Sequence, residues 1–310
     1  MRPIDWLLKG DPVIQYLTKR YLLDEKVIYQ EKGYIDRYFQ LYDVQTRMWG
    51  GGIYSPKWIS THYTLMELKY MEVFPMHQIY QEATLNLLNH MWYNKGLVTK
   101  KRYQDMCVSA MIMGLVCYGR IEDIKVNQII DYILRRQFKD GGWNCDWQRE
   151  MKPKKSSLHT TISVLEALYE FEKLDTGYRL SEISRAVPKA WEFILRKRLF
   201  RSVRTHEVIN RDMASFHYPM RWKYDAFRAL EYFQSIKMPY DIRMQEAIDI
   251  ILSQMEKGYI TQGKHYPGKI HFQLEDTKAS RFNTFRALKI LKFYDERSYE
   301  MIINQDYTYK

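Results

Sequence analysis

Segments with helical periodicity follow one another along almost the whole chain, and this repetition limits the fold more than any other feature. Apolar residues recur at helical spacing, whereas no segment alternates convincingly between apolar and polar residues as a strand would. We therefore predict an all-α fold. The predicted helices cover residues 11–22, 26–40, 60–72, 77–93, 104–118, 123–138, 157–172, 186–198, 222–234, 242–256 and 279–294.

Two kinds of predicted helix alternate. One kind, such as VNQIIDYILRRQ (126–137), has a narrow apolar stripe and a charged face, as expected of an outer helix. The other, such as SAMIMGLVCY (109–118), is apolar nearly all round, as expected of a helix buried on both sides. Because such pairs recur about every 45 to 60 residues, we expect a repeat architecture. The predicted fold is a two-layer α/α toroid of about five to six helix pairs, forming a single domain over residues 1–310.

The composition limits the classes of function without choosing one. The net charge of +11 attracts anions such as nucleic acid, acidic membranes or phosphorylated small molecules, although the scattered basic residues also suit a solvated surface. We expect no nucleic-acid partner. No apolar run reaches the roughly 18 residues that span a bilayer, and charges among the first residues argue against a signal peptide. The three cysteines favour a reducing cytoplasm and free or metal-bound thiols.

A glycine-containing motif links a predicted outer helix to the next inner helix. QFKDGGW (137–143) is its clearest copy, and QTRMWGGG (45–52) and QMEKGYI (254–260) are weaker ones. Gln137 can bond backbone groups at the helix end, Gly141 and Gly142 allow a left-handed turn, and Trp143 can fold back onto the layer. The motif resembles the QxxDGxW repeat of squalene and hopene cyclases and of protein prenyltransferase β subunits, which implies the toroid fold.

The two branches of this superfamily differ in their chemistry. The DxDD motif of the cyclases and the DDxxD motif that holds magnesium are both absent from the sequence. The prenyltransferase branch binds zinc through a DxC at the start of one inner helix and a histidine at the start of the next. The resemblance therefore implies a zinc site of Asp105, Cys107 and His159, with Cys107 and His159 52 residues apart. Three protein ligands leave a fourth position open, as in catalytic zinc sites.

Each proposed ligand also has an ordinary structural interpretation. Asp105 is equally a helix N-cap, Cys107 a small buried residue, and His159 a polar residue at a helix start. Cys145, 14 residues before His159, is a further candidate. It would either close the zinc site as a fourth ligand, which makes the site structural, or lie near an open one.

Several further residues are candidates for substrate binding. The resemblance relates STHYT around His62 to the family's HGGYT, which helps to hold a prenyl diphosphate, and Lys101 and Arg102 are basic groups suited to the same diphosphate. Aromatic side chains near the inner-helix starts could line an isoprenoid pocket or simply form core. These are Tyr63, Trp143, Trp222 and Tyr224, together with Trp58 and Phe282. Asp225 and His217 lie in the aromatic and basic segment 216–227 and are candidates for polar contacts or proton transfer in the cavity.

Three hypotheses follow. In the first, a cytoplasmic zinc enzyme of prenyltransferase type binds an isoprenoid diphosphate, with magnesium as a second ion, and transfers the prenyl group to a zinc-activated nucleophile; a partner chain is expected by analogy. In the second, a cyclase-like lyase uses Asp225 or Asp146 as its acid in place of DxDD. In the third, a non-catalytic toroid has a structural zinc site and binds a lipid or a protein.

Overall fold

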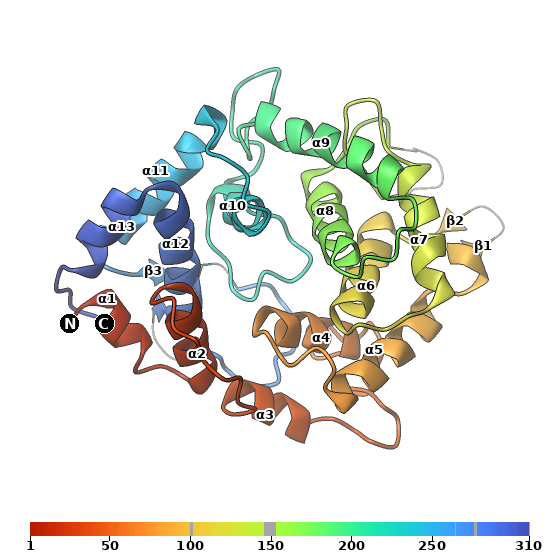
Figure 1. Cartoon of the computed structure of the whole chain (residues 1–310), viewed down its shortest axis with the longest axis horizontal. Coiled ribbons are helices and arrows are strands. Elements are labelled where there is room, and N and C mark those ends of the chain that lie inside the picture. The colour runs from red at the N-terminus through yellow and green to blue at the C-terminus, as the bar shows by residue number, and fades with distance from the viewer. Residues whose placement is uncertain (100–101, 146–152, 264, 276–277, 310) are drawn as a thin grey trace. The chain divides into compact units, whose positions relative to one another are not determined.

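The computed structural model describes residues 1–99, 102–145, 153–263, 265–275 and 278–309 (Figure 1). These residues contain thirteen α-helices and only two short two-stranded ribbons, so the prediction of an all-α chain is confirmed in its coarse form. None of the described helices combines the length and the apolarity needed to cross a bilayer. The closed ring of helix pairs stays a prediction.

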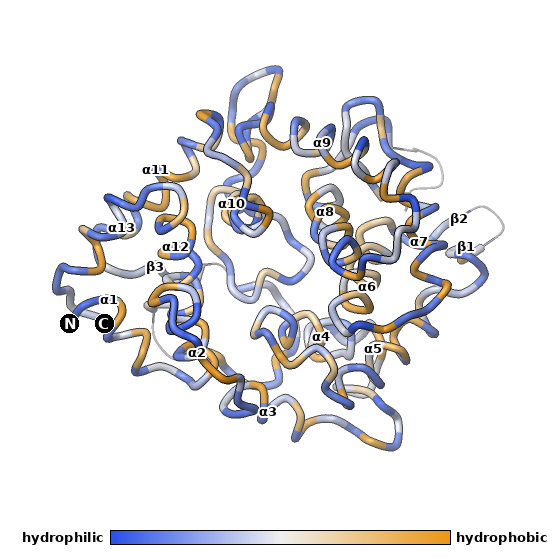
Figure 2. The backbone as a smooth tube through the Cα atoms, viewed as in Figure 1, coloured by the Kyte–Doolittle hydropathy of each residue, from blue (hydrophilic) through white to orange (hydrophobic). Residues whose placement is uncertain are grey.

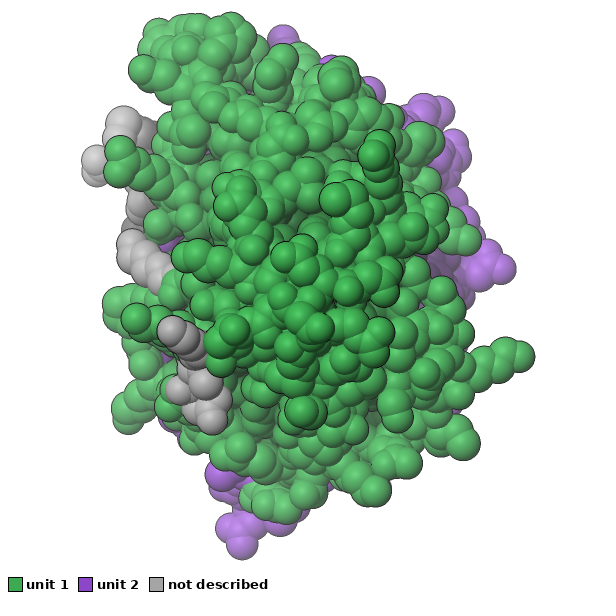
Figure 3. Space-filling view, turned by 90° about the vertical axis from the view of Figure 1, so that its left-hand side faces the viewer, with its two compact units in different colours: residues 1–40, 195–220, 224–310 green, residues 41–194, 221–223 purple. Residues whose placement is uncertain are grey.

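The chain forms two compact units, which Figure 3 distinguishes by colour. Unit 1 comprises Met1–Gln40, Leu195–Met220 and Tyr224–Lys310. Unit 2 comprises Leu41–Ile194 and Arg221–Lys223. The single domain over residues 1–310 stays a prediction.

Unit 2 contains the helices that carry most of the candidate site. Within it, α6 and α8 lie side by side, α4 contacts α6, and α5 and α7 pack against α6 (Figure 1). β1 and β2 pair as an antiparallel ribbon ahead of α6. Its elements are α4 (Thr61–Tyr70), α5 (Gln78–Met91), the 3-10 turn η1 (Asn94–Gly96), β1 (Leu97–Thr99), β2 (Arg102–Tyr103), α6 (Met106–Tyr118), α7 (Ile124–Leu134), α8 (Leu158–Glu172) and most of α9 (Leu180–Arg196).

The distinction between inner and outer helices holds in unit 2. Every side chain of α6 from Val108 to Cys117 is buried, in keeping with its apolar sequence, which Figure 2 shows in orange. Gly114 of α6 faces Ala167 of α8, and a Cβ at Gly114 would be in ordinary van der Waals contact with Ala167 at 3.4 Å. The outer helix α7, in contrast, alternates buried apolar residues with partly exposed polar ones. The hydrophobic effect therefore fixes α6 and α8 as the centre of the unit.

Unit 1 is organised around α12, which contacts α2, α10, α13 and β3 (Figure 1). Its residues from Phe282 to Leu288 are buried. β3 and β4 pair as an antiparallel ribbon beside it. The elements of unit 1 are α1 (Pro3–Leu7), α2 (Pro12–Tyr21), α3 (Tyr34–Gln40), η2 (Arg211–Ala214), α10 (Ala226–Ser235), η3 (Ile242–Met244), α11 (Gln245–Met255), β3 (Ile260–Thr261), β4 (Ala279–Ser280), α12 (Arg281–Tyr294) and α13 (Glu296–Ile303).

Several predicted boundaries are wrong. The helix predicted over residues 26–40 begins only at Tyr34, because Gly33 has a left-handed φ of 66° and Asp11 Oδ1 accepts the Tyr34 N–H at 3.2 Å. The helix predicted from residue 222 begins at Ala226. α9 begins at Leu180, ahead of the predicted residue 186, and continues through Pro188. The short helices α1 and α13 were not predicted, since neither is long enough to show a clear apolar repeat.

Candidate functional site

The QFKDGGW segment fixes the loop that carries Cys145. Gln137 Nε2 donates to the carbonyl oxygens of Gly141 (2.7 Å) and Ala186 (2.8 Å), so it bonds backbone groups as predicted, but these groups belong to its own loop and to α9 rather than to the end of α7. Gly141 has a φ of 100°, and a Cβ there would lie 2.2 Å from the Lys189 carbonyl oxygen. Gly142 needs no left-handed turn; its lack of a side chain makes room for Thr161 instead.

Trp143 locks the same loop onto unit 2. Its backbone N–H donates to Thr161 Oγ1 at 3.0 Å, and its indole N–H donates to the Ile133 carbonyl oxygen at 2.9 Å. The side chain is fully buried. Trp143 is therefore a core residue in this structure, with its donor already used, and it does not line a binding surface. The consequence for the site is that the loop returns Cys145 to the start of α6.

Cys107 and Cys145 form a thiol pair at the N-terminal end of α6. Their Sγ atoms lie 3.2 Å apart, the Cys107 backbone N–H donates to Cys145 Sγ at 3.5 Å, and Thr160 Oγ1 lies 3.5 Å from the same sulfur. The hydrogen bonds with Cys107 and Thr160 lower the pKa of Cys145, against the effect of its burial. Sharing a proton with Cys145, together with burial, raises the pKa of Cys107. Cys145 is therefore the more acidic thiol of the pair.

Asp105 stands at the N-cap position of α6, as its structural interpretation predicts, but its side chain makes no cap hydrogen bond. Its Oδ1 lies 3.8 Å from Arg102 Nη2, so Arg102 faces this carboxylate. His159, in the first turn of α8, has its ring centroid 5.4 Å from that of Trp222. Across the residues that the structure describes, no three His, Cys, Asp or Glu side chains are close enough together to hold a metal. The structure thus brings two of the four predicted ligands into contact.

Aromatic and basic side chains lie next to the thiol pair. The ring centroids of Tyr54 and Tyr63 are 5.4 Å apart, and Trp58 packs edge-on against Tyr63 at 4.7 Å. Burial raises the pKa of Tyr54, and the charges of Asp105, Cys107 and Cys145 add to that increase, which places Tyr54 within electrostatic reach of all three groups. The start of α4 and the start of α6 therefore share one region of unit 2.

Lys57 is the basic group of this region, and the sequence interpretation missed it. Its Nζ lies 5.4 Å from the Trp58 ring centroid and 6.0 Å from that of Trp222. Lys57 is exposed and forms no ion pair with any acid among the described residues. Lys57 lies in the segment between the weak motif copy at 45–52 and α4. This position was the only feature of the sequence that could have indicated a role for Lys57 in the site.

Arg221 and Glu67 form a buried ion pair that the sequence did not predict. Arg221 Nη1 contacts Glu67 Oε1, and the guanidinium lies over the Trp58 ring at 5.3 Å. Glu67 is on α4, whereas Arg221 belongs to the short 221–223 segment that joins unit 2. The high density of aromatic and basic residues at 216–227 was the sequence feature that could have drawn attention to Arg221. Since Glu67 neutralises Arg221, Lys57 is the stronger candidate for binding an anion.

His62 is held neutral beneath this aromatic and basic region. It is fully buried, and neither ring nitrogen has a hydrogen-bond partner within the described part of the chain. Burial, followed by the nearby charge of Lys57, lowers the pKa of His62 to about 3. Tyr54 and Tyr63 flank the ring, with centroids 5.1 and 4.9 Å away. His62 is therefore an uncharged, fully buried group of this region.

Two predicted substrate-binding residues belong to unit 1 and have structural roles there. Tyr224 is buried and donates its hydroxyl to the Leu199 carbonyl oxygen at 2.6 Å. Asp225 caps α10 by accepting the Arg228 N–H at 2.7 Å. Burial alone would raise the pKa of Asp225, but the charge of Arg286 and the contact with His217 hold this pKa below its usual range. Asp225 is therefore ionised and unsuited to the proton donor that the lyase hypothesis requires. Lys101 and Asp146 lie outside the described residues.

Comparison with known proteins adds no further evidence on the family. No protein-family model and no curated protein sequence matches the chain.

Proposed function

We propose that unit 2 contains a catalytic zinc site of prenyltransferase type, in which Asp105, Cys107 and Cys145 bind the metal. The observation that carries the proposal is the contact between the two thiols, whose Sγ atoms lie 3.2 Å apart. With Zn–S bonds of about 2.3 Å, two sulfurs of a tetrahedral site are separated by about 3.8 Å. A movement of roughly 0.6 Å would therefore suffice to admit zinc between them, and both sulfurs are soft donors that zinc prefers.

Asp105 is the best third ligand, and its carboxylate would also have to move towards the two sulfurs, because the three side chains are not grouped closely enough to hold a metal as they stand. It stands two residues before Cys107, and its charge acts on both thiols. His159 faces Trp222 instead, so a three-ligand site would leave one position open. Zinc bound there would supply a Lewis acid that lowers the pKa of a thiol or water in the open position.

The surrounding side chains fit an isoprenoid diphosphate. Lys57, which is exposed, would pair with the diphosphate. Tyr54, which is partly exposed, would contact the prenyl chain, and the buried Tyr63 and Trp58 would support its ring from behind. The acceptor nucleophile would then attack the prenyl carbon while the diphosphate leaves.

Metal content tests the zinc site. Purified protein is expected to contain about one zinc ion per chain, and Cys107→Ser and Cys145→Ser are expected to lose it. Cys117→Ala is the matched control, because Cys117 lies in the same helix but is buried away from the pair. Zinc far below one per chain in the wild type, or equal retention in all three variants, would contradict the proposal.

Binding of farnesyl diphosphate tests the substrate class. Quenching of tryptophan fluorescence is expected on binding, since Trp58 and Trp222 lie beside Lys57. Lys57→Gln should weaken binding about tenfold, whereas Lys189→Gln, an exposed lysine on α9, should leave it unchanged. Absence of any prenyl diphosphate binding would remove the transferase proposal while leaving the zinc site intact.

A closed structural zinc site is the second candidate, and the position of Cys145 favours it. With Cys145 as a ligand, only His159 is needed to complete a four-coordinate site. Cobalt substitution separates the two candidates. His159→Ala would remove one nitrogen ligand from a closed site and change the visible spectrum, whereas an open site would keep its spectrum.

A further inference from the structure

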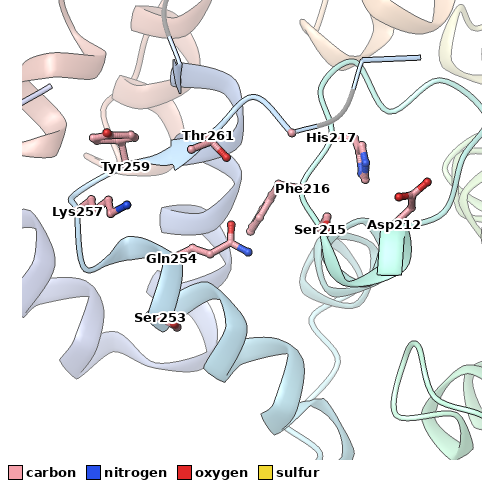
Figure 4. A pocket seen from close by; sticks show the side chains of 10 residues that line it. Asp212, Ser215, Phe216, His217, Ser253, Gln254, Lys257, Tyr259 and Thr261 are labelled. Atoms are coloured by element: carbon pink, nitrogen blue, oxygen red, sulfur yellow. The ribbon is translucent and has the colours of Figure 1, made fainter. Parts of the chain in front are cut away.

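A cavity of about 380 Å³ lies within unit 1, between the loop that follows η2 and the end of α11 with β3 (Figure 4). This volume is at the small end of the range for ligand pockets. Gly263 has a φ of 77°, and a Cβ there would lie 1.9 Å from the Phe216 carbonyl oxygen. Only glycine therefore lets this wall of the cavity close against the loop.

The α11 side of the cavity is the weak motif copy QMEKGYI, whose Gln254, Lys257 and Tyr259 line the space. In the strong copy, the side chain of Gln137 is fully used by two backbone carbonyl groups. The side chain of Gln254 lines the cavity and makes no hydrogen bond to any described residue. The weak copy thus presents to the cavity the glutamine side chain that the strong copy uses to bond backbone groups.

The opposite wall carries acceptor groups. His217 is 2% exposed, yet neither ring nitrogen has a hydrogen-bond partner among the residues described. Asp225 Oδ2 lies 3.9 Å from Nδ1, too far for a hydrogen bond. Tyr266 stacks on the ring, with the two centroids 5.2 Å apart. Nε2, the other ring nitrogen, has no hydrogen-bond partner among the described residues.

Charge is divided between the two walls. Figure 4 shows Asp212 with His217 on one side, and Lys257 with Tyr259 on the other. Lys257 is exposed and has no acidic partner in the described part of unit 1. Phe216 and Tyr259 add aromatic surface. A ligand complementary to these two walls would combine a negatively charged group, a positively charged hydrogen-bond donor and an apolar part.

We propose that this cavity binds a small zwitterion of the amino-acid type with an apolar side chain. Its carboxylate pairs with Lys257, its amino group donates to His217 Nε2 and faces Asp212, and its side chain packs on Phe216 and Tyr259. The proposal concerns unit 1 alone and does not depend on the zinc site.

Calorimetric titration of the full chain with three probes tests this assignment. L-Phenylalanine carries all three features, 3-phenylpropionate lacks the amino group, and phenethylamine lacks the carboxylate. L-Phenylalanine is expected to bind saturably, and each truncated probe should bind at least tenfold more weakly. Equal affinity for the three probes, or no saturable binding of L-phenylalanine, would overturn the proposal.

Two variants assign the contacts. Lys257→Met is expected to weaken L-phenylalanine at least fivefold while leaving phenethylamine unchanged. His217→Leu should weaken L-phenylalanine while leaving 3-phenylpropionate unchanged. Lys9→Met, which removes an exposed lysine outside the cavity, is the control. Because Lys257 is exposed, its variant keeps the test decisive even if His217→Leu fails to fold; an unchanged affinity in Lys257→Met would overturn the assignment.

Discussion

A buried helix follows an aspartate in each unit, and the surroundings of the two aspartates differ. Asp225, before α10, is 2% exposed, caps the helix through the Arg228 N–H and lies 3.4 Å from Arg286. Asp105, before α6, makes no cap hydrogen bond, and its side chain is 30% exposed. One carboxylate is therefore buried and bonded within its own unit, whereas the other is partly exposed beside Arg102. The same residue type at the same helix position is structural in one case and a binding candidate in the other.

Removing the charge of each aspartate in turn tests this difference most directly. Asp225→Asn should lower the free energy of unfolding by about 2–3 kcal/mol, because it removes one of the two carboxylates that pair with the buried Arg286, the other being that of Glu231. Asp105→Asn should lower it by about 1 kcal/mol or less in metal-free protein, since Arg102 is partly exposed. Urea unfolding followed by circular dichroism measures both. Losses of similar size would mean that Asp105 is as structural as Asp225.

The thiol pair, unlike the Asp225 cluster, depends on a loop held by a glycine. Gly141→Ala should destabilise the protein by about 2–3 kcal/mol, because the residue is left-handed and a Cβ would clash with the Lys189 carbonyl oxygen. It should also reduce zinc content, since the loop delivers Cys145. Gly177→Ala is the control: its φ is 72° but nothing lies within 4 Å of the new Cβ, so about 1 kcal/mol is expected. Equal effects would refute the role of the close approach at Gly141.

The two units should also respond to acid in different ranges. The pKa of His62 is about 3 in the folded protein and 6.5 when unfolded, so the unfolded chain takes up a proton first as the pH falls. Stability should therefore drop by about 2 kcal/mol between pH 7.5 and pH 5. Asp225 has a lowered pKa, so its contribution is lost only below its unfolded value of 3.8.

A comparison of variants isolates the histidine. His62→Asn cannot titrate, and its unfolding free energy should vary less between pH 7.5 and pH 5 than that of the wild type by the same 2 kcal/mol. Asp225→Asn should keep the wild-type slope over this range. If the His62 variant has the wild-type slope, His62 is not the buried neutral group that the structure describes.

The sequence predicted the helices best where burial is complete. α6 and α8 are apolar nearly all round, and both predictions came within two residues of the observed ends. The prediction of a helix over residues 26–33 was wrong. The turn at Gly33 and the hydrogen bond from the Tyr34 N–H to Asp11 override the helical pattern there. Boundaries set by such long-range hydrogen bonds leave no periodic signal.

For the candidate site, the sequence determined which residue types are present and which helices they begin. Asp105, Cys107 and His159 fall at the starts of α6 and α8, because polar residues followed by apolar runs mark helix starts. The tertiary structure alone decided which of them meet. Cys145 lies 38 residues from Cys107, and only the bonds of Gln137 and Trp143 and the left-handed Gly141 fold its loop back to that thiol. Such contacts depend on the path of the loop, which local sequence patterns do not encode.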